Sequence, residues 1–184
     1  MGKLIQWNLV SLDGYFEGAK SWDLDWFQSF WGPELESFSV EQLRSAGMLI
    51  FGRVTYDGMA AHWQTAQGEI ADFMNRLPKA VFSNSLKSPR WANTRVISND
   101  PAAAVRKLKL ETPQNLFVFG SGKLSATLFQ QGLFDEVRLA LVPMVLGRGT
   151  ALFGRELNRT GMKLLEARPL TNGCVILRYQ PQGK

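Results

Sequence analysis

Leu116-Phe-Val-Phe-Gly-Ser-Gly-Lys-Leu-Ser-Ala-Thr-Leu-Phe129 is the segment from which the fold of this chain can be read. Its first four residues are apolar and predict a buried strand, after which Gly120 and Gly122 flank a single serine. From Lys123 onward, apolar residues recur at helical spacing. A strand that turns through glycines into a helix gathers free backbone N–H groups, and the helix N-terminus adds positive potential. The segment therefore predicts a binding site for an anion, most often a phosphate.

A second junction of the same kind follows the wholly apolar run at residues 48–51, which is typical of a strand buried on both faces. Gly52 ends this run, and the helix that it opens carries Arg53 and Thr55 in its first turn. A third apolar strand, residues 80–82, leads into Ser83 and Asn84. Ligands of open α/β sheets bind beyond the carboxyl ends of the strands, so these junctions together favour one dinucleotide. Each glycine taken alone is equally compatible with a structural turn.

Strands and helices alternate up to about Gly132, and only strands follow. Alternation favours right-handed crossovers and a parallel sheet with helices on both faces. The Asn-Gly pair at 172–173 separates two strand-like segments and predicts a hairpin. We therefore expect one domain, residues 1–184, with a three-layer α/β/α fold and a mixed, mostly parallel sheet that ends in an antiparallel C-terminal hairpin. The expected strands cover 4–10, 48–51, 80–82, 95–97, 116–119, 136–141, 163–170 and 174–180, and the expected helices 26–30, 34–46, 53–61, 69–77, 101–110 and 123–131.

Composition narrows the chemistry that the protein can perform. Cys174 is the only cysteine and His62 the only histidine, which excludes an intrachain disulfide, a cysteine-rich metal site and a histidine cluster. The net charge of +5 has three readings: a mildly basic protein, a field that attracts phosphorylated small molecules, or nucleic-acid binding. The scattered basic residues argue against the last reading. No apolar run approaches the roughly 20 residues of a membrane helix, and no signal peptide is visible, so we expect a cytoplasmic protein.

The Rossmann pattern is absent, because Ser125 stands where its last glycine would be, and so is the Walker pattern. Six other motifs follow one another along the chain: Ser11-Leu-Asp-Gly14, Phe51-Gly-Arg-Val-Thr-Tyr56, Phe82-Ser-Asn-Ser85, Phe119-Gly-Ser-Gly-Lys-Leu124, Leu141-Val-Pro-Met-Val-Leu-Gly-Arg-Gly149 and Asn172-Gly-Cys-Val-Ile-Leu-Arg-Tyr179. Together they resemble the dihydrofolate reductase superfamily, and above all its branch with the C-terminal reductase domain of bifunctional riboflavin-biosynthesis proteins. Relatives often carry Gly-Gly where this chain has Gly120-Ser121.

This resemblance implies a dihydrofolate-reductase-like fold, NADPH as hydride donor and a homodimer. It implies that Arg53 and Thr55 contact cofactor phosphates and that Ser83 and Asn84 lie near the 2′-phosphate and the adenine. The segment from Gly120 to Leu124 would hold the pyrophosphate. The expected cofactor-binding residues are Gly52, Arg53, Thr55, Ser83, Asn84, Gly120, Ser121, Gly122, Lys123 and Leu124.

The substrate side carries fewer signals. Asp23-Leu-Asp-Trp-Phe27 is similar to a stretch of true dihydrofolate reductases in which the aspartate binds the pterin ring and assists protonation. Asp23 is therefore a candidate catalytic residue, with a helix cap as the alternative. Asp13 is a second catalytic candidate, or else a turn residue. Trp22, Trp26 and Phe27 are expected to wall the substrate pocket, and Gly147 and Gly149 to form its floor or a plain loop.

The first functional hypothesis is an NADPH-dependent reductase that transfers a hydride to a C=O or C=N of a pyrimidine or ribose-derived substrate. Two substrates compete: 5-amino-6-(5-phosphoribosylamino)uracil, favoured by the riboflavin-type motifs, and a dihydropterin, favoured by Asp23. The chain holds no deaminase domain before the reductase, so we expect a monofunctional enzyme that binds neither metal, nucleic acid nor membrane. A nucleotide-binding module without catalysis is the alternative from another class.

Overall fold

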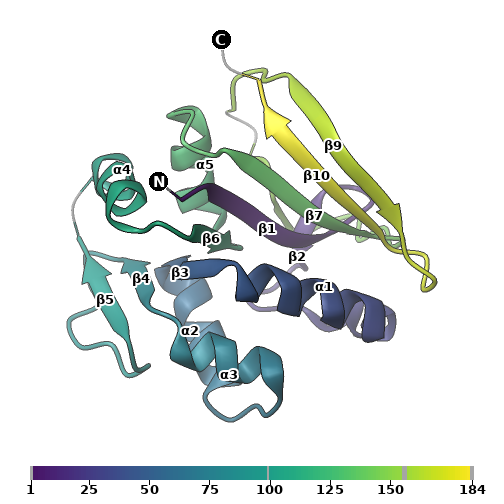
Figure 1. Ribbon diagram of the computed structural model, residues 1–184. Helices are drawn as coiled ribbons and strands as arrows, with labels where there is room; N and C mark the ends of the chain where they lie inside the picture. Colours follow the sequence, from purple (N-terminus) through teal and green to yellow (C-terminus); the bar gives the residue numbers. More distant parts are fainter. Residues whose placement is uncertain (1, 99, 155–156, 183–184) are drawn as a thin grey trace.

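A computed structural model describes residues 2–98, 100–154 and 157–182. Within them, one mixed sheet forms the centre of the molecule, and its strands fan out as Figure 1 shows. The sheet order is β5 (Thr94–Ile97), β4 (Lys79–Phe82), β3 (Ala46–Gly52), β6 (Asn115–Phe119), β1 (Leu4–Ser11), β7 (Glu136–Val142), β10 (Val175–Pro181) and β9 (Met162–Pro169). The pairings from β5 to β7 are parallel, and β10 is antiparallel to both of its neighbours.

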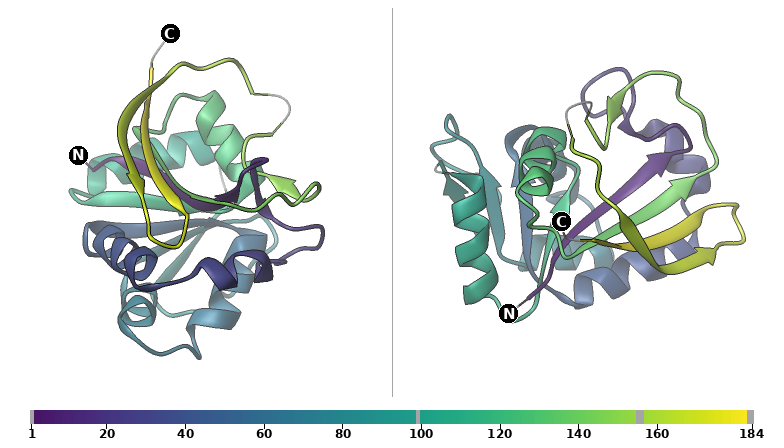
Figure 2. Two further views of the ribbon diagram at one scale, coloured as in Figure 1. Left: turned by 90° about the vertical axis from the view of Figure 1, so that its right-hand side faces the viewer. Right: turned by 90° about the horizontal axis from the view of Figure 1, so that it is seen from above.

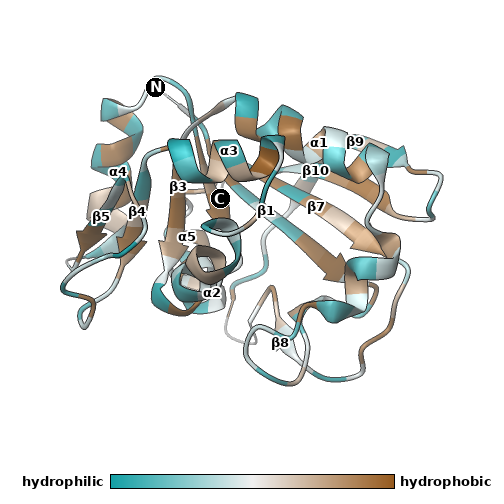
Figure 3. Cartoon of the chain, turned by 90° about the horizontal axis from the view of Figure 1, so that it is seen from below, coloured by the Kyte–Doolittle hydropathy of each residue, from teal (hydrophilic) through white to brown (hydrophobic). Residues whose placement is uncertain are grey.

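Helices cover both faces of this sheet, as the two views of Figure 2 show. On one face α1 (Pro33–Arg44), α2 (Arg53–Trp63) and α3 (Glu69–Arg76) pack with Leu49, Phe51 and Phe117. On the other, α4 (Pro101–Glu111) and α5 (Gly122–Gln130) pack with Ile50 and Val118. Because successive residues of a strand point to opposite faces, the fully apolar central strands serve both cores. Hydrophobic colour accordingly concentrates on the central strands in Figure 3. The predicted three-layer α/β/α fold is confirmed.

The C-terminal hairpin forms as predicted. β9 and β10 pair antiparallel at the edge of the sheet, and Gly173 in their turn has a φ of +87°, a conformation that glycine adopts without strain. The predicted helix start at Asp100 is also confirmed, since its carboxylate accepts a hydrogen bond of 2.9 Å from the Ala102 N–H.

Two features differ from the expectation. A second, two-stranded sheet pairs β2 (Tyr15–Glu17) with β8 (Thr150–Ala151), and both strands are too short to give a periodic signal in the sequence. The segment expected as a helix at 26–30 is a 3₁₀ helix, η1 (Asp25–Phe30). In the described part of the chain, no helix combines the length and apolar character needed to cross a membrane.

Candidate cofactor and substrate site

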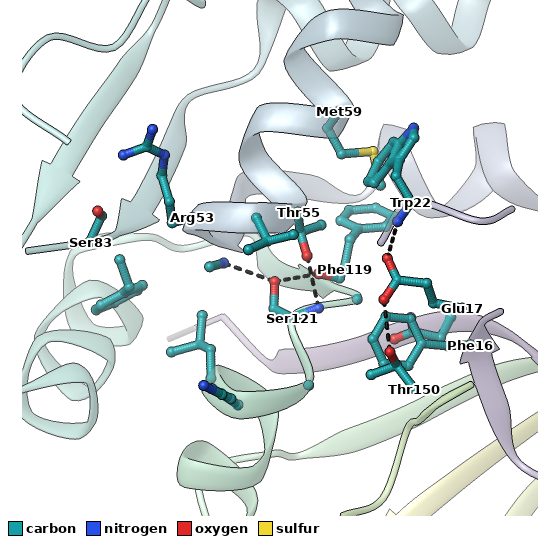
Figure 4. A pocket seen from close by; sticks show the side chains of 18 of the residues that line it. Phe16, Glu17, Trp22, Arg53, Thr55, Met59, Ser83, Phe119, Ser121 and Thr150 are labelled. Atoms are coloured by element: carbon teal, nitrogen blue, oxygen red, sulfur yellow. Dashed lines mark hydrogen bonds between the residues drawn. The ribbon is translucent and has the colours of Figure 1, made fainter. Parts of the chain in front are cut away.

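A cavity of about 730 Å³ lies where the carboxyl ends of β5, β4, β3, β6 and β1 meet. This volume is within the range of small-molecule sites. Figure 4 shows its two sides: Arg53 and Ser83 lie to one side of Thr55 and Ser121, and Trp22 and Glu17 to the other. The loop between β1 and η1, together with β8, forms the second side. The sheet thus provides the row of polar strand ends, and the loops provide an additional wall.

Two helices begin at this cavity without a side-chain cap. Gly52 is the N-cap of α2 and Ser121 the N-cap of α5, and in neither helix does a backbone N–H of the first turn donate a capping hydrogen bond to the side chain of the N-cap residue. The first N–H groups of a helix have no acceptor within the helix itself. Those of Arg53 in α2 and of Gly122 and Lys123 in α5 are therefore suited to an anionic ligand in the cavity.

Ser121 connects the two helix starts. Its hydroxyl accepts a hydrogen bond of 2.8 Å from the Gly52 N–H and donates one of 2.9 Å to the Phe119 carbonyl. The Ser121 N–H in turn donates to Thr55 Oγ1 at 3.0 Å. These bonds use the backbone amides of Gly52 and Ser121 within the protein, so these two amides shape the site and do not face a ligand. The hydroxyl of Ser121 thus has a structural role at a position where relatives often carry glycine.

The chain turns sharply before α5. Gly120 has a φ of +51° and Ser121 one of +60°, so two successive residues are left-handed. A Cβ at Gly120 would lie 3.2 Å from Thr55 Oγ1, so glycine is favoured there by both backbone and space. Ser121 tolerates the same conformation because its hydroxyl and amide are both held by neighbours.

Arg53 supplies positive charge at the rim. Its Nε lies 2.6 Å from an Asp57 carboxylate oxygen, and its Nη1 donates to Ser85 Oγ at 3.4 Å. With 40% of its side chain exposed, the guanidinium keeps donors available for a phosphate. Asp57 therefore orients the Arg53 guanidinium group without burying it. Lys123 lines the same cavity from the first turn of α5.

The structure brings the ten sequence-predicted cofactor residues to this one cavity. These residues come from the ends of three strands, β3, β4 and β6, and from the first turns of α2 and α5. Their assignment as cofactor contacts stays a prediction. The lining includes Gly52, Arg53, Thr55, Ser83, Asn84, Gly120, Ser121, Gly122, Lys123 and Leu124.

The expected substrate residues are only partly brought together. Trp22 and Phe27 line the cavity. Trp26 does not: its ring stands edge-on to Phe27, at 5.4 Å between centroids, and packs against the hydrophobic core. Gly147 and Gly149 also lie outside the lining. A Cβ at Gly149 would come within 2.2 Å of the Glu17 carbonyl oxygen, so this glycine allows its loop to pack on β2.

Asp13 lies outside the cavity lining and ties two loops together. Its carboxylate accepts hydrogen bonds from the Ser11 hydroxyl at 2.6 Å and from the N–H groups of Leu146 and Gly147 at 3.1 and 2.7 Å. The Ser11 hydroxyl, with help from the two amides, lowers the pKa of Asp13. A carboxyl group that ionises more readily than usual is a poor proton donor at neutral pH. The turn alternative fits this geometry better than the catalytic one.

Asp23 also lies outside the lining. Its carbonyl oxygen accepts a 2.9 Å hydrogen bond from the Gly18 N–H, and its carboxylate lies so near Gly18 that a Cβ there would be 2.3 Å from Oδ2. The N-cap of η1 is Leu24, and no side chain caps it. Asp23 is thus neither a cap nor a cavity residue, but part of the turn before η1.

Sequence reasoning missed Glu17, the carboxylate that does line the cavity. One of its oxygens accepts a hydrogen bond from the Trp22 N–H and the other accepts one of 2.8 Å from Thr150 Oγ1. Thr150 is 133 positions away in the chain, so no local pattern predicts this pairing. Thr150 directly follows Gly149, the last residue of the fifth motif, so the motif marked this part of the chain but not the pairing.

Comparison with known proteins places these observations in a family. The RibD C-terminal domain family matches residues 3–176. The uncharacterized protein YyaP of Bacillus subtilis strain 168 is 28% identical over 180 residues, which are 95% of this chain and 92% of that protein. YwjB of the same strain, also uncharacterized, is 25% identical over 162 residues, or 88% of each chain.

Solved structures share the fold at low sequence identity. A protein of Shewanella sp. PV-4 assigned provisionally to riboflavin biosynthesis has a TM-score of 0.82 at 19% identity, and the match covers 98% of this chain and 99% of that one. Dihydrofolate reductase from Enterococcus faecalis, complexed with NADP(H), has a TM-score of 0.69 at 11% identity over 99% of this chain and 98% of its own. The chain belongs to the RibD C-terminal domain family and has the dihydrofolate-reductase-like fold.

Proposed function

We propose that this protein is an NADPH-dependent reductase. The observation that carries the proposal is the convergence of two uncapped helix starts, with Arg53 and Lys123, on one cavity at the strand ends. Such an arrangement suits a ligand with two linked phosphates and a third anionic group. The Enterococcus faecalis dihydrofolate reductase of similar fold binds NADP(H), which supports the same choice here.

In this proposal each group of residues has a separate task. The N–H groups at the start of α5, from Gly122 to Leu124, hold the pyrophosphate, and the Arg53 guanidinium binds a phosphate beside it. Ser83 and Asn84 lie at the adenosine end, by the 2′-phosphate. When bound, NADPH supplies a hydride from its nicotinamide ring. The protein therefore has to orient the two reactants and exclude competing reactions.

For the substrate, the family favours a C=O or C=N of a pyrimidine or ribose-derived compound. A bifunctional protein from Thermotoga maritima with a TM-score of 0.70 at 12% identity is named as a deaminase and 5-amino-6-(5-phosphoribosylamino)uracil reductase. The match covers 98% of this chain and 57% of that one, so the likeness concerns one part of the Thermotoga protein. The alternative, a dihydropterin, rested on Asp23, which does not line the cavity.

The experiment is a turnover assay with NADPH and a panel of pyrimidine, ribosylaminopyrimidine and dihydropterin compounds. Loss of the absorbance of the reduced cofactor, dependent on one of these compounds and on the protein, is the expected result.

A nucleotide-binding module without catalysis is the second candidate. Among the described lining residues Glu17 is the one carboxylate, and both of its oxygens already accept hydrogen bonds, so these residues include no carboxyl group without a hydrogen-bond partner. Binding of NADPH without turnover of any compound in the panel would favour this candidate.

A further inference from the structure

The two halves of the cavity differ in charge. Arg53 and Lys123 lie in the half formed by the helix starts. Of the described residues that line the other half, beyond β1, Glu17 is the one ionisable side chain. The remaining wall holds the uncharged hydroxyl of Thr150 and is otherwise mostly apolar, with Phe16, Trp22, Leu24, Phe27 and Met59.

A phosphate group does not suit this second half. Phosphate is bound by cationic side chains or by free backbone N–H groups at a helix start. Both of those features lie at the first half, where the cofactor phosphates would occupy them. In the second half a phosphate would meet apolar side chains and the Glu17 carboxylate, and burying it there without a partner would be costly. Arg148, on the nearby loop, is exposed and is not part of the lining.

Three elements position Trp22: β2 and β8 hold its backbone through Glu17, and α2 contacts its indole. Its backbone has a φ of +64°, an unusual conformation for a bulky residue, and its N–H donates to Glu17 on β2. Thr150 on β8 holds the other oxygen of that carboxylate. The indole lies against Gly58 of α2, where a Cβ would be 2.2 Å from the ring carbon Cε3. A flat aromatic wall fixed in this way suits a planar ring.

We infer that the substrate is an uncharged, planar ring compound without a phosphate group, which packs against Trp22. This inference rests on the proposed reductase function and narrows its substrate class: it favours a phosphate-free ring compound over 5-amino-6-(5-phosphoribosylamino)uracil. In the reaction the carbon of a ring C=N bond gains a hydride from NADPH, which is thereby oxidised to NADP⁺, and the nitrogen gains a proton (H⁺) from the solvent. The nitrogen–carbon double bond becomes single, and no other co-reactant is needed.

The test uses compounds that differ by one phosphate. 5-Amino-6-(5-phosphoribosylamino)uracil, its dephosphorylated form and 7,8-dihydrobiopterin are titrated calorimetrically into protein saturated with NADP⁺, so that binding is measured without turnover. We expect at least one phosphate-free compound to bind at least about tenfold more tightly than the phosphorylated one. Equal or tighter binding of the phosphorylated compound overturns the inference, and so does the absence of binding by both phosphate-free compounds at millimolar concentration.

Two variants locate the binding. Gly58→Ala displaces the indole without removing it and is expected to weaken the phosphate-free compound by about tenfold. Gly32→Ala is the matched control, because a Cβ there meets nothing within 4 Å, and it leaves binding unchanged. Trp22→Leu, which removes the aromatic wall, gives the same loss if Gly58→Ala does not fold.

Arg148→Ala tests the alternative of a phosphate held on the nearby loop. We expect no effect on any of the three compounds, whereas weaker binding of the phosphorylated compound alone would contradict the inference. A separate titration with NADPH keeps the two proposals distinguishable. If NADPH does not bind while the phosphate-free ring does, the reductase proposal fails and the choice of ring stands.

Discussion

Among single residues, Arg53 allows the most specific prediction about NADPH binding. Its side chain is 40% exposed at the rim of the cavity, and its Nε lies 2.6 Å from a carboxylate oxygen of Asp57, which orients the guanidinium group. Arg53→Ala should raise the dissociation constant for NADPH by about ten- to a hundredfold, because a charge-assisted hydrogen bond contributes about 1.5–3 kcal/mol. Fluorescence titration measures this. Arg90→Ala, which removes an exposed arginine outside the lining, serves as the control and should leave the affinity unchanged. Equal affinities for the two variants would remove Arg53 from the site.

The Thr55 side chain is expected to contribute both to the stability of the fold and to NADPH binding. Its Oγ1 accepts the hydrogen bond of the buried Ser121 N–H, so Thr55→Val leaves that amide without a partner. We expect a loss of about 1–3 kcal/mol in the free energy of unfolding, with weaker NADPH binding because the turn before α5 loses its support. Urea unfolding and a cofactor titration provide the two readouts. Thr65→Val, which removes an exposed hydroxyl bonded to the His62 carbonyl, should change neither.

At the level of the elements, the end of α3 is closed by the buried Lys79 side chain. Its Nζ donates to the carbonyl oxygens of Met74, Asn75 and Leu77 at 2.8, 3.1 and 2.7 Å, which are left without helical partners. The ammonium also lies 4.6 Å from the centre of the Trp91 ring. β4 and α3 are therefore joined by one polar side chain inside an apolar layer.

Burial lowers the pKa of Lys79 from 10.5 to about 8. Between these two pH values the unfolded chain holds a proton that the folded chain releases, so the free energy of unfolding rises with pH across this window. The gain amounts to about 3 kcal/mol at most. Chemical unfolding of wild type and Lys79→Met at pH 7 to 10 isolates the effect, because the rise should be absent in the variant. Lys107→Met, at a side chain that is 77% exposed, should keep the wild-type slope; an identical slope in Lys79→Met would refute the assignment.

The elements also show what a sequence can and cannot reveal. The glycine junctions at Gly52 and Gly120 were predictable because strand, glycine and helix follow one another in the chain, and the topology then brings them together. The pairing of Glu17 with Thr150 joins two strands of two or three residues that have no periodicity of their own. The position of the Asp23 side chain could not be predicted for the same reason, because the turn that directs it depends on contact with Gly18. The catalytic role of Asp23 stays a prediction.

The buried ion pairs of Glu136 in the sheet were also not predicted from the sequence. Glu136 lies on β7 and is fully buried, with Arg138 Nε at 2.8 Å and Arg178 Nε at 2.7 Å. Burial raises the pKa of Glu136, but the two guanidinium groups outweigh it and the net shift is downward. Arg138 lies on β7 itself, two positions from Glu136, but Arg178 lies on β10, 42 positions away, so the sequence of β7 alone does not reveal this second guanidinium group.

For the whole molecule, the homodimer implied by the family resemblance stays a prediction, and the hairpin edge offers a surface for it. On the face of β7, β10 and β9 opposite Arg178 and Glu166, cross-strand neighbours are apolar: Leu139 pairs with Leu177, and Tyr179 with Leu164. Leu164 is 51% exposed. A second copy would cover this uncharged row, whereas a charged partner would find no complement there.

Sedimentation velocity tests this prediction. The wild-type protein should sediment as a dimer and Leu164→Glu as a monomer, because a buried charge without a partner weakens the interface. Leu110→Glu alters a leucine on α4 that is 75% exposed and should remain dimeric. A wild-type monomer at high micromolar concentration would contradict the prediction.

The account as a whole depends on one cavity that binds a reduced nicotinamide dinucleotide across two helix starts. Isothermal titration of the wild-type protein with NADPH measures this without any assumption about the substrate. We predict one site per chain with a dissociation constant on the order of 1–100 μM, as is usual for enzyme cofactors and substrates. No heat of binding up to millimolar NADPH would contradict the account.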